Sequence, residues 1–293
     1  PRGVYRRTSL ASYQSASPEW DILFNLDALA AQEGLDWQLS RISHCTTLPQ
    51  RCLISLSIGG SDASVCREFD LVSQQWVAGG FSFPLGKNQI HWRDQHSVFV
   101  CPAWDESQLT AAGYPCEAWL LTRGQCWDEA LLLAVLPEDV FKVMAWRFLD
   151  VDGSAFDILE VALSFYRRSY YHIAADGGLN PIKLPTSAEI QVYSHGDLIV
   201  KLTADWGDYR SGSLLALACE QGRLGRIQLL LPPDAQMQSL SASRNFLIVS
   251  CLEQVKTRLR IFHVDSSAWH EVAHDLPNSG VIELIDQPWQ SDR

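Results

Sequence analysis

The sequence contains no apolar run of about 18 residues, so no segment has the length and hydropathy of a membrane-spanning helix. The first residues, Pro1 to Arg7, include no apolar stretch of signal-peptide type. Basic residues are also in deficit, since 23 Lys and Arg oppose 34 Asp and Glu and give a formal net charge of −11. Such a surface repels a nucleic-acid backbone and an anionic membrane. We therefore expect neither nucleic acid nor a membrane as a partner.

The cysteines form no Cys-x-x-Cys pair, which excludes a zinc ribbon and a thioredoxin-type redox site. Their even number permits disulfides. In a chain of 293 residues, however, scattered cysteines are more typically small buried hydrophobic residues of a protein in a reducing compartment. We therefore expect free thiols and a cytoplasmic location, with the periplasm as the alternative. The cysteines are Cys45, Cys52, Cys66, Cys101, Cys116, Cys126, Cys219 and Cys251.

The overall composition is that of a packed globular protein. Apolar residues make up 47% and charged residues 19%, which excludes disorder, collagen-like repeats and a coiled coil as the main state. Aromatic residues include 11 Trp, and the 18 Gly and 13 Pro occur in scattered turn-like groups. This mixture favours an all-β fold with many short strands.

Only Asp27–Glu33 has the pattern of a helix. Short runs rich in β-branched and aromatic residues, separated by turn residues, predict strands elsewhere. They lie at 20–26, 52–57, 64–71, 90–92, 97–101, 117–122, 130–136, 143–149, 158–165, 170–174, 182–184, 198–202, 213–218, 226–231, 239–242, 246–252, 258–263, 269–272 and 281–285. Hairpin turns are predicted at Gly59-Gly60, Asp152-Gly153, Asp176-Gly177-Gly178 and His195-Gly196-Asp197.

Roughly twenty strands are too many for one open sheet, which leaves a sandwich, a barrel or a propeller. Groups of strands recur about every 45–50 residues, close to the length of one four-stranded propeller blade. The sequence therefore favours a β-propeller of four-stranded antiparallel blades, with about six blades by period and little helix.

Gly59-Gly60-Ser61-Asp62-Ala63 is the nearest match to a nucleophile elbow. An elbow requires a strand before the serine and a helix after it. Strand-like runs lie on both sides here, so we interpret Ser61 as a hairpin residue.

His270-Glu271-Val272-Ala273-His274 matches a zinc-peptidase pattern that requires both histidines on one face of a helix. Turn residues on both sides leave room for about two helical turns, and no third ligand follows at a suitable spacing. In a strand, the two histidines would lie about 13 Å apart, too far to share one metal. We therefore expect no metal site here.

Asp150–Asp157 is similar to a calcium loop, but its glycine comes two residues early and no Glu stands at the twelfth position. A polar hairpin tip is the better interpretation. The pairs Arg6-Arg7 and Arg167-Arg168 are interpreted as solvated strand faces, and no Gly-rich phosphate loop occurs. We therefore predict no catalytic, cofactor-binding or metal-binding residue in the chain, and no cofactor.

Several phrases resemble, in the same order along the chain, the N-terminal β-propeller of bacterial prolyl oligopeptidase-like serine peptidases. None is decisive alone, but their co-linear order is specific. They are Gly3–Thr8, Pro18-Glu19-Trp20, Asp27–Gly34 with Trp37, Ser55–Ala63, Arg67–Leu71, Gly80-Phe81 with Pro84, Leu109–Pro115, Arg123-Gly124, Gly212–Ala216 and Val255–Leu259.

The resemblance implies a seven-bladed propeller that caps an α/β-hydrolase domain and admits only short peptides to a Ser/Asp/His site. On this basis residues 1–293 form one propeller domain that is partial at both ends, and the hydrolase domain is absent from this chain. Cys101–Glu106 departs from the family, where a Gly-rich loop is expected. No propeller residue is therefore assigned to substrate binding.

We expect a domain that selects short peptides for a serine oligopeptidase, with the α/β-hydrolase domain of the same protein as its partner. The chain alone is expected to be inactive. The alternative is a stand-alone propeller that serves as a protein-interaction module.

Overall fold

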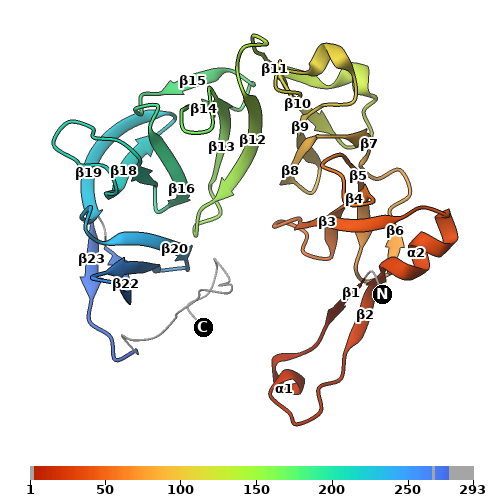
Figure 1. The fold of residues 1–293 in the computed structure, drawn as a ribbon, viewed down its shortest axis with the longest axis horizontal. Helices are drawn as coiled ribbons and strands as arrows, with labels where there is room; N and C mark the ends of the chain where they lie inside the picture. The colour runs from red at the N-terminus through yellow and green to blue at the C-terminus, as the bar shows by residue number, and fades with distance from the viewer. Residues whose placement is uncertain (1–2, 266–267, 277–293) are drawn as a thin grey trace. The chain divides into compact units, whose positions relative to one another are not determined.

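The structure is a computed structural model and describes residues 3–265 and 268–276. The chain divides into two compact units, Pro1–Trp146 (unit 1) and Arg147–Arg293 (unit 2). The division falls inside strand β12 (Lys142–Leu149). Each unit is built from antiparallel sheets, and helices are few and short (Figure 1).

Unit 1 begins with a hairpin of β1 (Val4–Arg7) and β2 (Asp21–Asn25), with helix α1 (Leu10–Tyr13) at its far end (Figure 1). Helix α2 (Leu26–Glu33) follows directly, which confirms the predicted helix. The Asn25 side chain accepts a hydrogen bond from the Ala28 amide and caps the first turn of α2. Gly34 ends α2 at φ 69°, a left-handed conformation that favours glycine.

Two larger sheets complete unit 1. In the first, the edge strand is split, because β6 and β7 both pair with β5 at different points. The second contains four strands in the order β8-β9-β10-β11. The strands are β3 (Trp37–His44), β4 (Arg51–Ile58), β5 (Ser64–Asp70), β6 (Gln75–Trp76), β7 (Ser82–Gly86), β8 (Gln89–Asp94), β9 (Ser97–Cys101), β10 (Glu117–Thr122) and β11 (Leu131–Val135). Short 3-10 helices lie at Glu106–Gln108 and Trp127–Glu129.

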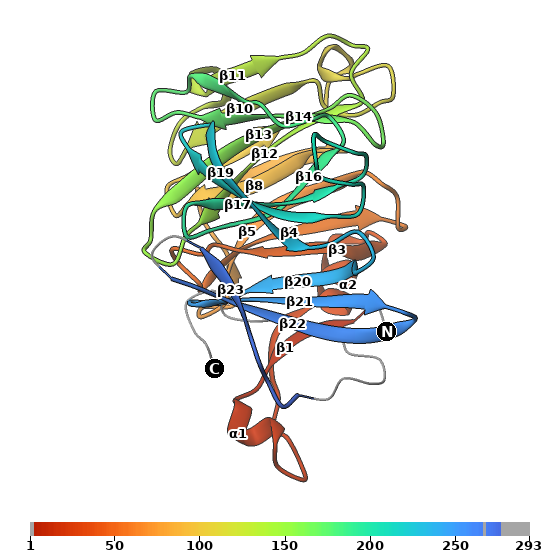
Figure 2. The ribbon, with the colours of Figure 1, turned by 90° about the vertical axis from the view of Figure 1, so that its left-hand side faces the viewer.

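Three four-stranded sheets follow, each with its strands in chain order (Figure 2). Apart from the first residues of β12, they belong to unit 2. Their further strands are β13 (Ala155–Ala162), β14 (Arg168–Ile173), β15 (Leu179–Ile182), β16 (Ala188–Ser194), β17 (Asp197–Leu202), β18 (Leu214–Glu220), β19 (Arg223–Leu231), β20 (Gln236–Ala242), β21 (Phe246–Glu253), β22 (Lys256–Val264) and β23 (Trp269–Val272).

The repeat of about 45–50 residues predicted from the sequence is close to the spacing of these sheets, although the first two spacings are slightly longer. Their first strands begin at Trp37, Gln89, Lys142, Ala188 and Gln236. The described residues thus form five sheets of the four-stranded blade type, besides the two-stranded β1-β2 sheet. The all-β fold of four-stranded antiparallel blades with little helix is confirmed.

The predicted hairpin turns are also present. Gly59, Gly153, Gly177 and Gly196 all have positive φ. The φ angle of His195 is also positive, at 53°, so both central residues of the β16-β17 turn have a left-handed conformation. This geometry matches the twist of the flanking strands.

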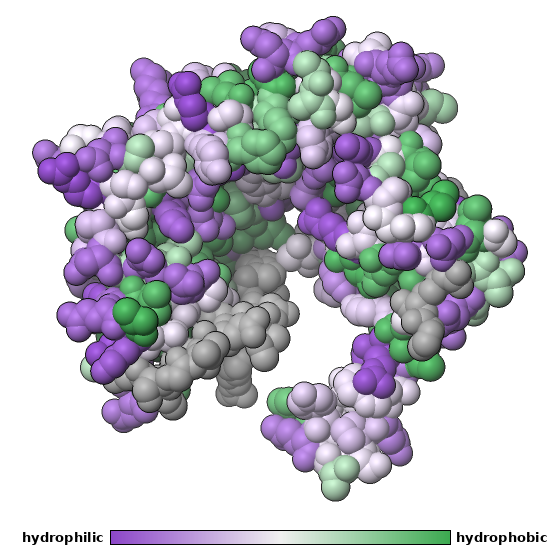
Figure 3. Space-filling model, in the orientation of Figure 1, coloured by the Kyte–Doolittle hydropathy of each residue, from purple (hydrophilic) through white to green (hydrophobic). Residues whose placement is uncertain are grey.

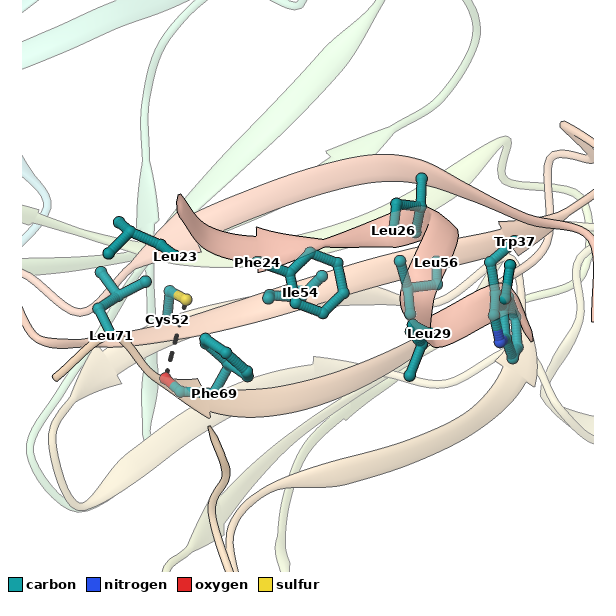
Figure 4. Close-up of a cluster of buried hydrophobic side chains, with 11 residues drawn as sticks. Leu23, Phe24, Leu26, Leu29, Trp37, Cys52, Ile54, Leu56, Phe69 and Leu71 are labelled. Carbon is teal, nitrogen blue, oxygen red and sulfur yellow. Dashed lines mark hydrogen bonds between the residues drawn. The ribbon is translucent and has the colours of Figure 1, made fainter. Parts of the chain in front are cut away.

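The first hydrophobic core of unit 1 lies between helix α2 and the β3–β6 sheet (Figure 4). Leu26 and Leu29 of α2 face Ile54 and Leu56 of β4. Burial of such side chains contributes about 1.5–3 kcal/mol each. The core also contains Cys52, whose thiol donates to the Phe69 carbonyl at 3.8 Å.

All eight cysteines are free thiols in the structure, and seven of them are buried. They therefore act as small core residues, as expected from their scattered spacing. The exception is Cys126, which is exposed.

Five strands were not predicted: β1, β3, β6, β7 and β16. The strand predicted at 182–184 overlaps β15 only at Ile182. The strand predicted at 281–285 lies outside the described residues.

Figure 3 shows hydrophilic side chains over most of the visible surface of both units, with smaller apolar patches between them. In the part of the chain that the structure describes, no helix is long enough and apolar enough to span a membrane.

Candidate functional site

Ser61 lies in the hairpin between β4 and β5, as the sequence predicts. Its hydroxyl donates to the Ala63 carbonyl at 3.1 Å, two residues further along the same turn. Strand β5 follows at Ser64, so no helix N-terminus lies behind the hydroxyl. The geometry of a nucleophile elbow is absent from this turn.

His270 and Glu271 belong to strand β23, and His274 follows its end. The Glu271 carboxylate is ion-paired with Arg260 of β22. His270 Nε2 lies 2.8 Å from an Asp265 carboxylate oxygen, and His274 Nε2 lies 2.9 Å from the Leu259 carbonyl oxygen. The three side chains thus have separate partners, and the structure does not bring them together as one ligand set.

Asp150–Ser154 forms the hairpin tip between β12 and β13, as predicted for the start of this segment, and Ala155–Asp157 belong to β13. The Asp150 carboxylate accepts hydrogen bonds from the backbone amides of Val151, His195 and Gly196 at 2.7–2.9 Å. Asp157 pairs with Arg147 at 2.5 and 2.7 Å. Asp150 therefore joins two consecutive sheets, because His195 and Gly196 form the β16-β17 turn.

The first arginine pair lies on the exposed face of the β1-β2 hairpin, as predicted. Arg6 stacks over Trp20 at 4.0 Å, and Arg7 pairs with Asp21 at 3.0 Å.

The interpretation of Arg168 as a solvated residue is wrong. Its side chain is 20% exposed, and its guanidinium binds Glu189 of β16 at 2.5 Å. It therefore connects β14 to the next sheet, and a partner so distant in the sequence leaves no local signal. Its neighbour Arg167 donates to the Thr186 hydroxyl at 3.2 Å.

Glu68 of β5 is a buried carboxylate that joins the two larger sheets of unit 1. It is 2% exposed and accepts two hydrogen bonds from the Arg123 guanidinium, at 2.9 and 3.0 Å. The Phe81 amide donates to it at 2.9 Å, and Arg51 lies 3.5 Å away. Gly80 is needed beside it, because a Cβ there would lie 2.8 Å from the carboxylate oxygen.

Asp197 of β17 makes a third connection of this kind, in unit 2. It is 2% exposed and accepts two hydrogen bonds from Arg226 at 2.8 and 3.0 Å. The Trp269 indole N–H of β23 donates to the same carboxylate at 2.9 Å. Asp197 therefore joins the β16–β19 sheet to the β20–β23 sheet.

One serine–histidine hydrogen bond occurs among these groups. The Ser194 hydroxyl lies 2.9 Å from His195 Nδ1, but Ser194 is only 3% exposed. The hydroxyl is therefore closed off from a substrate, and the pair stabilises the turn.

An aromatic pocket of about 650 Å³ lies between β7 and the β10-β11 connection of unit 1. Trp104 contacts Trp127 at a ring-centroid distance of 5.0 Å and lies nearly parallel to Phe83 at 6.3 Å. Arg123 lines the same pocket and stacks over Phe81 at 4.6 Å. Its charge is already engaged by Glu68, so the pocket presents mainly aromatic surface.

A second pocket, of about 420 Å³, lies between the same two sheets of unit 1 and is polar. We call it the Arg41 pocket. Hydroxyl groups dominate its wall, and Asp62 is its only acidic side chain. It is lined by Ser40, Arg41, Ser43, Leu53, Ser55, Ser61, Asp62, Ser64, Cys66, Lys87, Asn88, Gln89, Ile90 and Tyr114. Sequence reasoning did not single out Arg41, which stands in a strand that was not predicted.

Comparison with protein families gives one match, which covers the whole chain. The prolyl oligopeptidase N-terminal β-propeller domain matches residues 1–293. An uncharacterized peptidase of Sinorhizobium fredii is 27% identical over 311 residues, which include all of this chain and 42% of that protein. An uncharacterized peptidase of Rickettsia prowazekii is 23% identical over 96% of this chain and 42% of its own length. The chain therefore spans less than half the length of these relatives.

Solved structures agree on the fold. A post-proline cleaving enzyme from Rickettsia typhi superposes with a TM-score of 0.86 at 23% identity. The match covers 94% of this chain and 44% of that enzyme.

Proposed function

Since the chain belongs to the prolyl oligopeptidase family, as its N-terminal β-propeller domain, we propose that it selects short peptides for a serine peptidase. In this proposal residues 1–293 are one propeller domain, whose partner is an α/β-hydrolase domain of the same protein. The family assignment over the whole chain is the observation that carries the proposal.

The side chains that could have supplied chemistry support a role without catalysis. Ser61 is held within its own hairpin, and Ser194 is buried. Glu68, Asp150 and Asp197 are each engaged by donors from the next sheet. These groups stabilise the domain, and the hydrolysis itself is assigned to the catalytic partner.

Selection by size has a physical basis in these connections. A buried carboxylate that loses its partners costs several kcal/mol, so adjacent sheets resist separation. In this proposal, sheets that resist separation limit the size of the peptide that can pass. Peptides that fit enter, and larger ones are excluded.

The experiment uses the full natural polypeptide and a nested series of peptides with one central proline, from short to long. We expect kcat/KM to fall steeply with peptide length. The variant Arg123→Ala removes the connection to Glu68 and should weaken this dependence on length. The matched control is Arg210→Ala, which removes an exposed ion pair with Asp205 and should leave the dependence unchanged.

Cleavage that is independent of peptide length in the unaltered polypeptide would overturn the selection role. Absence of any cleavage would instead favour the alternative, a propeller that acts as a protein-interaction module.

A further inference from the structure

The Arg41 pocket contains an arginine without a carboxylate partner. Arg41 lies on β3, and no carboxylate in the part of the chain that the structure describes pairs with it. In a chain with more acidic than basic residues, most other arginines of unit 1 are engaged, including Arg51, Arg67 and Arg123. A free guanidinium that lines a cavity is therefore available to a ligand.

A β-bulge determines where Arg41 points. The pairing of β3 with β4 shifts between Leu39 and Arg41, so Ser40 is the extra residue and both Ser40 and Arg41 line the pocket. Equivalent bulges occur in β16 and β20, at Gln191 and Gln238. The amides of these two glutamines donate back to carbonyls of their own strands.

The surroundings of Arg41 are positive. Lys87 Nζ also lines the pocket, 5.1 Å from the Tyr114 ring. Its acidic neighbour Asp62 is 3.6 Å away with 81% of its side chain exposed, so water screens that pair strongly.

Two neighbouring groups respond to the charge of Arg41. Burial raises the pKa of the Cys66 thiol to about 11, although its hydrogen bond with Ser55 and the charge of Arg41 both oppose the rise. Burial, Arg41 and Lys142 together lower the pKa of His91 to about 3. His91 is therefore neutral at physiological pH and adds no positive charge to those of Arg41 and Lys87.

We propose that the Arg41 pocket binds a carboxylate, held by the planar fork of Arg41 with Lys87 and the hydroxyls of Ser40, Ser43 and Ser64 around it. Arginine offers two parallel N–H donors that match a carboxylate, and such charge-assisted hydrogen bonds are stronger than neutral ones. The ligand is either the C-terminal carboxylate of a peptide or a Glu or Asp side chain of one. The choice of a peptide as the source of the carboxylate rests on the proposed function.

The test measures peptide binding to the full natural polypeptide by isothermal titration calorimetry at low salt. The peptides contain no proline, so binding is separated from post-proline cleavage, and mass spectrometry verifies that each stays intact. Three versions of one neutral sequence are compared: a free C-terminus, an amidated C-terminus, and an amidated C-terminus with one internal Glu.

If the C-terminal carboxylate is the ligand, only the first peptide binds tightly, and if a side chain suffices, the third binds as well. Arg41→Ala should weaken binding of the carboxylate peptides about tenfold and leave the neutral amide unchanged. Arg41→Lys should restore only part of the affinity, because a lysine lacks the fork. The control is Arg244→Ala, which removes an exposed arginine outside this pocket and should have no effect.

Equal affinity for all three peptides would overturn the proposal, and so would an equal loss for the carboxylate peptides and the neutral amide in Arg41→Ala. Because the readout is binding, a polypeptide that cleaves nothing would contradict the proposed function and leave this test intact.

Discussion

Glu68 in unit 1 and Asp150 in unit 2 are both buried carboxylates that join consecutive sheets, but they meet different donors. Glu68 accepts from a guanidinium, which is itself charged, and from one backbone amide. Asp150 accepts only from backbone amides, two of which belong to the turn of the next sheet. The first connection depends on a second side chain, whereas the second depends on the shape of a turn.

This difference shows two ways to satisfy a buried charge. A guanidinium neutralises the carboxylate but is left as an unpaired, partly buried charge if its partner is lost. Backbone amides carry only partial charges. If the carboxylate is lost, they lack a hydrogen-bond acceptor, but no full charge is left unpaired. The two connections should therefore differ in the cost of their removal.

The largest effect is expected for Glu68→Ala. The substitution leaves the charge of Arg123 unpaired and the Phe81 amide without its acceptor, and should lower the free energy of unfolding by about 3–5 kcal/mol. Urea unfolding of the full natural polypeptide, followed by tryptophan fluorescence, measures the loss. The variant Arg123→Met in the Glu68→Ala background should recover part of it, because no unpaired charge remains. A loss below that of Asp150→Ala would contradict the distinction drawn between the two connections.

An intermediate effect is expected for Asp150→Ala, which leaves the amides of Val151, His195 and Gly196 without this acceptor. The free energy of unfolding should fall by about 2 kcal/mol. Asp150→Asn keeps one side-chain oxygen and should lose less. Hydrogen exchange at the His195 and Gly196 amides should accelerate in Asp150→Ala, and protection equal to the unaltered protein would refute the assignment.

The smallest effect is expected at the surface pair Arg7–Asp21, whose side chains are 56% and 50% exposed. Asp21→Ala should change the free energy of unfolding by less than about 1 kcal/mol, because water screens an exposed ion pair. The same urea experiment measures it. A loss comparable to that of Asp150→Ala would show that burial is not what separates these connections.

The sequence predicted the strands whose burial alternates or is continuous. Strand β9 (Ser97–Cys101) is buried at every position, and its predicted bounds agree with the structure. Strand β3 was not predicted because most of its side chains are exposed, so no apolar alternation marks it. Strand β16 carries a bulge at Gln191, which breaks the period of two on which the prediction depends.

The connections between sheets lay beyond sequence reasoning for a different reason. Arg123 lies 55 residues from Glu68, and Gly196 lies 46 residues from Asp150. A single sequence records no pairing over such separations. The same limit concealed the Arg41 pocket, since it is formed by strands of two sheets and by a bulge in β3 that local pattern does not reveal.

The direction of the three connections has a consequence for biosynthesis. In each case the carboxylate precedes the donor that reaches it from the following sheet, with Arg123 after Glu68, His195 after Asp150 and Trp269 after Asp197. A ribosome releases the chain from its N-terminus, so every acceptor is exposed before its donor exists. At these three places the earlier sheet therefore leaves a carboxylate open until the next sheet is made, whereas at Arg168–Glu189 the donor is made first.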